Sequence, residues 1–236
     1  MTHGCVIFDF DGVIANTEEI HLMAYNHALK ELRERLGKDI VLTPERYFSR
    51  YIVYGSSEGF DLVLRDAGIE ANRELVAALV SAKDRVIDRD IVQHAGLLPG
   101  VRQLLNHLAD RKVPTGICSG ARHHEIEPLL AAFGIADYFP VITAIEDVRQ
   151  GKPHPEGYSR TLQLLNERDE REFPARQSLV IEDTNGGAIA AHGAGMRVLG
   201  VATNSPLDHV RNWSEYAVED LAQLDFGELD SWIGLT

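Results

Sequence analysis

The sequence is poor in cysteine and in long apolar runs, and each absence excludes a class of protein. It has two cysteines in 236 residues, Cys5 and Cys118, too few for a disulfide framework or a cysteine-based zinc site. Both lie in apolar segments, so we expect buried thiols in a reducing compartment. No apolar run approaches the roughly 20 residues that span a membrane, and the first residues lack the pattern of a secretory signal. We therefore expect a cytoplasmic protein with no membrane partner.

Clustered positive charge is also missing. The chain carries 36 acidic and 23 basic residues, a net charge of −13, and its Lys and Arg residues are scattered. Nucleic acids and anionic membranes attract basic surfaces, so we expect neither as a partner. The acidic balance by itself indicates only solubility. The composition leaves open a monomer or a small homo-oligomer.

The first chemical signal is a pair of aspartates near the start of the chain. The apolar run from Cys5 to Phe8 predicts a strand buried on both faces of a parallel sheet. Asp9 and Asp11 follow it, and because side chains at i and i+2 of an extended chain share one side, they can share one site. Buried carboxylates are costly without a counter-charge, which favours a metal ion. The alternative is a loop with aspartates that cap a helix.

The pattern along the rest of the chain predicts two domains. Between residues 17 and 92 the apolar spacing is helical throughout, with starts at Thr17, Thr43-Pro44, Ser56 or Ser57, and Asn72. From Pro99 on, strands alternate with helices, which indicates a doubly wound parallel sheet. We therefore expect an α/β, Rossmann-like core made of residues 1–15 and 95–236, with an inserted all-helical domain at residues 16–94.

The predicted core strands end in polar residues. Ligands of open parallel sheets bind outside the carboxyl ends of the strands. Ser119 and Gly120 follow the strand 113–118 and form a candidate anion site, although Ser119 could instead be an ordinary helix cap. Lys152 lies in a loop stiffened by prolines, where it could hold a carboxylate and a phosphate, or be a solvated surface lysine.

Two further acids, Glu182 and Asp183, follow the apolar strand 178–181. A second acidic pair at the same edge of the sheet fits an Mg²⁺ site with oxygen ligands. If the acids only capped helices, both pairs would have to be caps that follow core strands by coincidence. A lysine and an anion-binding turn would also have to lie at the same edge of the sheet by coincidence.

These residues carry a resemblance to a known family. The ordered set resembles the four motifs of the haloacid dehalogenase-like hydrolase superfamily, and the helical insert looks like that of its beta-phosphoglucomutase and sugar-phosphate phosphatase subgroup. The motif residues are Asp9-x-Asp11-Gly12-Val13, Ser119-Gly120, Gly151-Lys152-Pro153 and Glu182-Asp183.

The resemblance implies a mechanism. Asp9 would attack phosphorus and form an aspartyl-phosphate, and Asp11 would protonate the leaving oxygen and then activate water. Mg²⁺ would bind Asp9, the backbone carbonyl of Asp11 and Asp183, with Glu182 nearby. The residues that would hold the phosphoryl group are Ser119, Gly120 and Lys152. An acid at position 11 argues against dehalogenation, which has no leaving oxygen to protonate.

The insert would be a cap whose substrate residues are Thr17, His21 and Lys83. Thr17 and His21 are one helical turn apart and can face the same way. His21 could also be a half-buried helix histidine, and Lys83 a solvated helix lysine. The substrate would be a small phosphorylated metabolite.

The subgroup contains both phosphatases and mutases. Where mutases carry an arginine in the second cap loop, this chain reads Gly55-Ser56-Ser57-Glu58. Arg46 or Arg50 could replace it, but the missing arginine favours a phosphatase over a mutase. A phospho-accepting regulatory domain is a further alternative, although its aspartate follows a later strand and it has no large insert. The last alternative is a binding protein that has lost catalysis, and the presence of Asp9, Asp11 and Lys152 argues against it.

Overall fold

The computed structural model describes residues 3–235. The chain divides into two compact units, one formed by Met1–Asn16 with Leu97–Thr236 and the other by Thr17–Gly96. Each unit has its own hydrophobic core, so each is described separately. Across residues 3–235, every helix is too short or too polar to cross a membrane.

The first unit is built on a six-stranded sheet with the order β5-β4-β1-β6-β7-β8. All neighbouring strands pair in parallel, and β1 is central, between β4 and β6. The strands are β1 (Val6–Phe8), β4 (Thr115–Cys118), β5 (Val141–Thr143), β6 (Leu179–Glu182), β7 (Arg197–Val201) and β8 (Tyr216–Val218). This is the predicted doubly wound α/β core.

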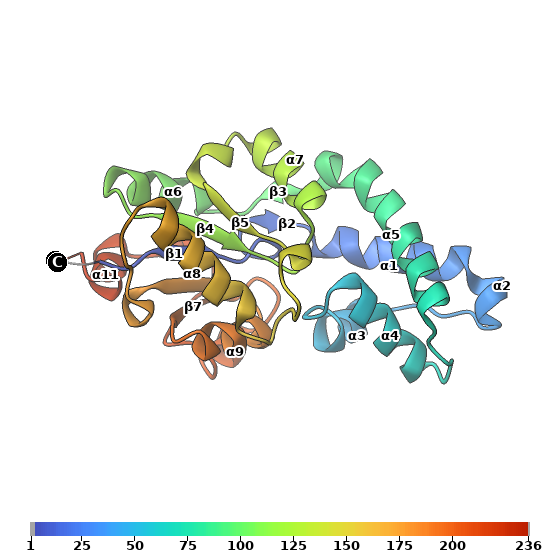
Figure 1. Ribbon diagram of the computed structural model, residues 1–236. Helices are drawn as coiled ribbons and strands as arrows, with labels where there is room; N and C mark the ends of the chain where they lie inside the picture. The colour runs from blue at the N-terminus through green and yellow to red at the C-terminus, as the bar shows by residue number, and fades with distance from the viewer. Residues whose placement is uncertain (1–2, 236) are drawn as a thin grey trace. The chain divides into compact units, whose positions relative to one another are not determined.

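Helices cover both faces of this sheet. Figure 1 shows α8 and α9 on one face and α6 and α7 on the other, as right-handed crossovers in opposite directions from the centre require. Because both faces are covered, β1 and the first three residues of β6 are apolar without alternation, and both strands are fully buried. The helices are α6 (Val101–Asp110), α7 (His123–Phe133), α8 (Glu156–Arg168), α9 (Asn185–Gly193), α10 (Leu207–Val210) and α11 (Phe226–Trp232), with 3-10 turns η1 (Ala136–Tyr138), η2 (Ile145–Asp147), η3 (Ala175–Gln177) and η4 (Leu221–Gln223).

The second unit is helical. Its helices are α1 (Glu18–Glu31), α2 (Arg33–Leu36), α3 (Pro44–Arg50), α4 (Ser56–Asp66) and α5 (Arg73–His94). Their apolar faces meet in a core that includes Tyr25, Leu29, Phe60 and Leu79. Where the chain leaves and re-enters the first unit, β2 (Ala15–Asn16) and β3 (Gly96–Leu97) pair as a two-stranded sheet.

The structure confirms two of the predicted helix caps in the second unit and contradicts a third. Thr43 accepts a hydrogen bond from Arg46 N and Asn72 accepts one from Leu75 N, which confirms both as caps. α1 begins directly after Thr17, as predicted, but the prediction that the Thr17 side chain caps this helix is wrong. Thr17 has helical backbone angles and makes no side-chain cap bond, and a cap needs an extended backbone to turn its side chain back onto the helix.

The reactivity of the two thiols tests whether the core of the first unit is packed as described. Cys5 and Cys118 are buried, and burial raises the pKa of Cys5 to about 11 and that of Cys118 to about 12. A raised pKa means that both thiols are neutral at pH 8, and a neutral thiol is a poor nucleophile. We expect Ellman's reagent to count no reactive thiol in the folded protein and two after unfolding in guanidinium. Fast reaction of either cysteine in the folded protein would contradict this packing.

Candidate active site

The polar residues that follow the strands of the first unit meet at one edge of its sheet. Phe8 at the end of β1 lies level with Ile117 of β4 and Ile181 of β6. The residues just beyond these three positions therefore emerge side by side. Among them are Asp9, Ser119 and Glu182-Asp183.

Three carboxylates form a compact acidic cluster at this edge. One oxygen from each of Asp9, Glu182 and Asp183 lies within 4.8 Å of the other two. All three side chains are buried, although carboxylates are rarely buried without a partner. Asp11 is half-buried, and its charge acts on Asp9, but its carboxylate is outside this group of three. Such a set of buried oxygen donors can hold a metal ion.

Lys152 supplies positive charge to the cluster. Its Nζ donates to Asp9 Oδ1 at 2.7 Å and to Glu182 Oε1 at 2.6 Å. The side chain is only 12% exposed, so the interpretation as a solvated surface lysine is wrong. Three carboxylates against one ammonium leave a formal charge of about −2 in a buried place, which a divalent cation would balance.

The pKa shifts follow from this crowding. Burial raises the pKa of Asp9 well above its ordinary value, and the charges of Glu182 and Asp11 raise it further, while the Lys152 ammonium opposes them. Burial lowers the pKa of Lys152, but the carboxylates of Asp9 and Glu182 outweigh it and raise that pKa above its usual range. Lys152 is thus a permanent cation, and Asp9 is a carboxylate whose ionised form depends on nearby positive charge.

Glu182 is held by donors on both of its oxygens. Besides Lys152, Oε1 accepts a hydrogen bond from the Tyr158 hydroxyl at 2.8 Å. Oε2 accepts from the backbone N–H groups of Asp183 at 3.1 Å and Thr184 at 3.0 Å, and from Thr184 Oγ1 at 2.9 Å. Five donors occupy the lone pairs of this carboxylate. Glu182 therefore has a fixed position between Lys152 and the start of α9.

Gly187 makes this position possible. A Cβ atom at residue 187 would lie 1.7 Å from Glu182 Oε1. Because the Glu182 carboxylate cannot move without losing its donors, we expect Gly187→Ala to lower the free energy of unfolding by about 1–3 kcal/mol. Urea unfolding would measure this change. The matched control is Gly96→Ala, where the added Cβ meets nothing within 4 Å; equal midpoints for both variants would contradict the prediction.

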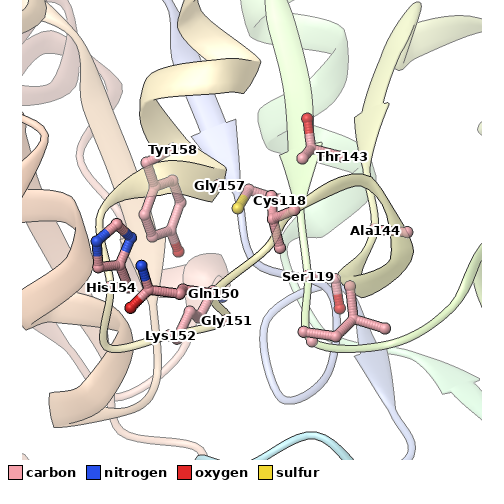
Figure 2. Close-up of a pocket in the computed structure, with 13 residues that line it drawn as sticks. Cys118, Ser119, Thr143, Ala144, Gln150, Gly151, Lys152, His154, Gly157 and Tyr158 are labelled. Carbon is pink, nitrogen blue, oxygen red and sulfur yellow. The ribbon is translucent and has the colours of Figure 1, made fainter.

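Ser119 and Lys152 line a small pocket. Its volume is about 10 Å³, and Figure 2 shows Ser119 and Cys118 from the end of β4 across from Lys152 and Tyr158. The Ser119 hydroxyl accepts a hydrogen bond from Ala121 N at 3.0 Å. The alternative that Ser119 caps the next helix is wrong, since α7 begins at His123 with Arg122 as its N-cap. Ser119 and the exposed Gly120 line the same pocket as Lys152.

The second unit has its own polar cluster, around the three residues expected to bind substrate. Lys83 is 3% exposed, which excludes a solvated helix lysine. Its Nζ lies 3.1 Å from His21 Nδ1 and donates to Ser56 Oγ at 2.9 Å. His21 is also buried, one turn after the buried Thr17 on the same helix. The structure thus brings His21 and Lys83 together within this unit.

Two polar residues that donate to the acidic cluster were not predicted from the sequence. Tyr158 lies on the first turn of α8 and donates to Glu182. Asn204 lies in the loop after β7, and its Nδ2 donates to Asp183 Oδ2 at 2.6 Å. For Asn204 the sequence carries a signal, because this residue also follows the carboxyl end of a core strand, β7.

Comparisons with known proteins show the family to which this chain is similar. Residues 6–201 match the family described as haloacid dehalogenase-like hydrolase. Protein CbbY of Rhodobacter capsulatus is 31% identical over 198 residues, which cover 82% of this chain and 83% of that protein. A phosphoglycolate phosphatase of Yersinia pseudotuberculosis is 30% identical over 196 residues, covering 83% and 79%. The crystal structure of CbbY from Rhodobacter sphaeroides in complex with phosphate has a TM-score of 0.79 at 25% identity, covering 94% of this chain and 96% of that one.

The fold and the site define a parallel α/β enzyme with a buried acidic centre at the carboxyl edge of its sheet. The chain belongs to the haloacid dehalogenase-like hydrolase family, which confirms the resemblance seen in the sequence. Within the family it is a hydrolase of the phosphatase type.

Proposed function

We propose that this protein is an Mg²⁺-dependent phosphatase that hydrolyses a small phosphorylated metabolite, a sugar phosphate, through an aspartyl-phosphate on Asp9. One observation carries the proposal. Lys152 Nζ lies 2.7 Å from Asp9 Oδ1, and the carboxylates of Asp9, Glu182 and Asp183 converge beside it. A nucleophile held between an ammonium and a cation site suits attack on an anionic ester, because the two positive charges offset the repulsion.

Asp9 and Asp11 share the covalent chemistry. An oxygen of Asp9 forms a bond to phosphorus while the bond from phosphorus to the ester oxygen breaks, and Asp11 gives its proton to that leaving oxygen. Asp11 then takes a proton from a water molecule. The resulting hydroxide attacks phosphorus, the Asp9–phosphorus bond breaks, and inorganic phosphate is released. Asp11 lies two residues from Asp9 on the same loop, which supports this division of roles.

The acidic cluster fits Mg²⁺, a hard cation that prefers oxygen ligands. Asp9, Asp183 and the backbone carbonyl of Asp11 would hold it, with Glu182 nearby. The five donors on Glu182 favour an indirect role for that residue. When bound, Mg²⁺ supplies positive charge that neutralises the phosphoryl oxygens.

The phosphoryl group would be held by Lys152 together with the turn at Ser119 and Gly120. Lys152 is a permanent cation fixed by two carboxylates, so it costs little reorganisation when the substrate binds. The similar structure of CbbY from Rhodobacter sphaeroides was solved in complex with phosphate. That complex supports an anion site in this chain as well.

The helical segment, residues 16–94, would be the cap domain, with Thr17, His21 and Lys83 as its substrate residues. The buried contact between Lys83 and His21 gives the unit a polar, positively charged group of the kind a phosphorylated metabolite needs. Cap closure would exclude water from the reaction. We place the enzyme in the cytoplasm as a monomer or small homo-oligomer, with neither nucleic acid nor membrane as a partner.

Two arginines of the second unit favour hydrolysis over the mutase alternative. A mutase must hold a second phosphate, and Arg46 and Arg50 were the candidates to do so. Arg50 instead donates to both oxygens of Asp66, at 2.5 and 2.7 Å, and Arg46 lies 3.6 Å from the same carboxylate. Both guanidinium groups are thus paired with the Asp66 carboxylate, which argues against their binding a second phosphate.

The test is an assay of purified protein on a panel of phosphate esters that includes beta-glucose 1-phosphate. Released phosphate and isomerised sugar are measured in parallel, with Mg²⁺ and with EDTA. We expect Mg²⁺-dependent phosphate release, and the preferred ester identifies the substrate. Isomerised sugar without net phosphate would establish the mutase alternative instead, and absence of turnover on every ester would overturn the proposal for these substrates.

A further inference from the structure

The loop that follows β7 reaches the acidic cluster through Asn204. The strands β6 and β7 are neighbours, with Glu182 level with Gly200. The chain that leaves β7 therefore starts beside the end of β6, where Asp183 lies. Asn204 is half-buried in this loop.

The contact between Asn204 and Asp183 is short and closely packed. Asn204 Nδ2 donates to Asp183 Oδ2 at 2.6 Å, and Asp183 is 1% exposed. A Cβ atom at Gly12 would lie 2.2 Å from Asp183 Oδ2 and 2.7 Å from Asn204 Nδ2. The backbone after Asp11 thus lies directly against this pair. Three loops, those after β1, β6 and β7, fix the position of one carboxylate.

The chemistry of the donor matters for a cation site. Asp9 and Glu182 both face the Lys152 ammonium, which neutralises part of their charge. The amide of Asn204 is neutral, so it can orient Asp183 without cancelling its negative charge. A lysine in its place would compete with a metal ion for the same oxygens. Groups that orient a metal ligand through a hydrogen bond commonly change metal affinity 10–100-fold when they are lost.

We infer that Asn204 is a positioning residue that holds Asp183 in the orientation required for cation binding. The inference rests on the proposed metal-dependent phosphatase function and extends it to a loop outside the four family motifs. Asn204 acts through Asp183 rather than by touching the substrate.

The test compares Asn204→Leu, which keeps the shape of the side chain but has no donor, with Thr203→Ala, an exposed neighbour in the same loop. Mg²⁺ is titrated calorimetrically into wild-type and variant proteins without substrate. The rise in melting temperature with Mg²⁺ concentration gives a second measure of affinity. Phosphate release is then assayed at increasing Mg²⁺.

We expect Asn204→Leu to bind Mg²⁺ about tenfold more weakly, with kcat recovering at saturating Mg²⁺, and Thr203→Ala to match the wild type. Recovery at high Mg²⁺ separates positioning from general damage to the fold. Equal Mg²⁺ affinity in wild type and Asn204→Leu, or lost activity that Mg²⁺ does not restore, would overturn the role of Asn204. A wild-type protein that binds no Mg²⁺ would overturn the proposed metal site itself, and the role of Asn204 with it.

Discussion

Asp9→Asn should reduce phosphate release by about 10⁴-fold or more, because the amide has neither the charge nor the nucleophilic oxygen of the carboxylate. Asparagine has nearly the shape of aspartate, so the buried position after β1 remains filled. The measurement is kcat/KM for phosphate release from the best ester of the panel. Mass spectrometry of acid-quenched wild-type enzyme during turnover should also find a phosphorylated peptide that contains Asp9, which the variant should lack.

The matched control is Asp110→Asn, the same substitution at an exposed position of α6. It should keep wild-type activity. A variant at position 9 that retains more than about a hundredth of wild-type kcat/KM would contradict the role of Asp9, since loss of a nucleophile costs far more than that. Phosphorylation at another residue would move the nucleophile there.

Lys152→Met should lower kcat/KM by about 10³-fold, the loss expected when a group that stabilises transition-state charge is removed. Methionine keeps much of the length and the apolar stem but not the ammonium. In the metal-free protein the change also leaves Asp9 and Glu182 without their shared cation. We expect the free energy of unfolding in EDTA to fall by about 3 kcal/mol, because breaking a buried ion pair leaves uncompensated charge.

Lys30→Met on the exposed side of α1 is the control and should change neither quantity. Because Lys152→Met is expected to destabilise the protein, Lys152→Arg is a second probe. It keeps the positive charge and the fold but replaces a point charge with a planar group. Lys152→Arg should therefore retain more activity than Lys152→Met, and activity of Lys152→Met within tenfold of the wild type would show that the phosphoryl group is held elsewhere.

The sequence was most informative where local rules apply. Runs of apolar residues located the core strands, and helical spacing located the insert. At Thr17 local rules gave the correct helix start but not the cap, because the Thr17 backbone has helical angles and its side chain makes no cap bond. Local rules also do not predict β8, because it is a short, half-buried strand without a distinct pattern.

Local rules also predicted only part of the candidate site. Asp9, Asp11, Glu182 and Asp183 could be found from their positions after buried strands. The alternatives for Lys152 and Lys83 could not be separated, because sequence does not report burial. In the structure Lys152 is only 12% exposed and lies between two carboxylates, and Lys83 is buried beside His21.

By itself, the sequence determined the class of fold, the edge of the sheet where the candidate site lies and the family motifs. These depend on residue type and spacing within about ten residues. Only the tertiary structure decided that Lys152 joins Asp9 to Glu182 and that Asn204 holds Asp183. The contact between Lys152 and Asp9 spans 143 positions of the chain. Such contacts depend on strand order and loop paths, which local periodicity does not encode.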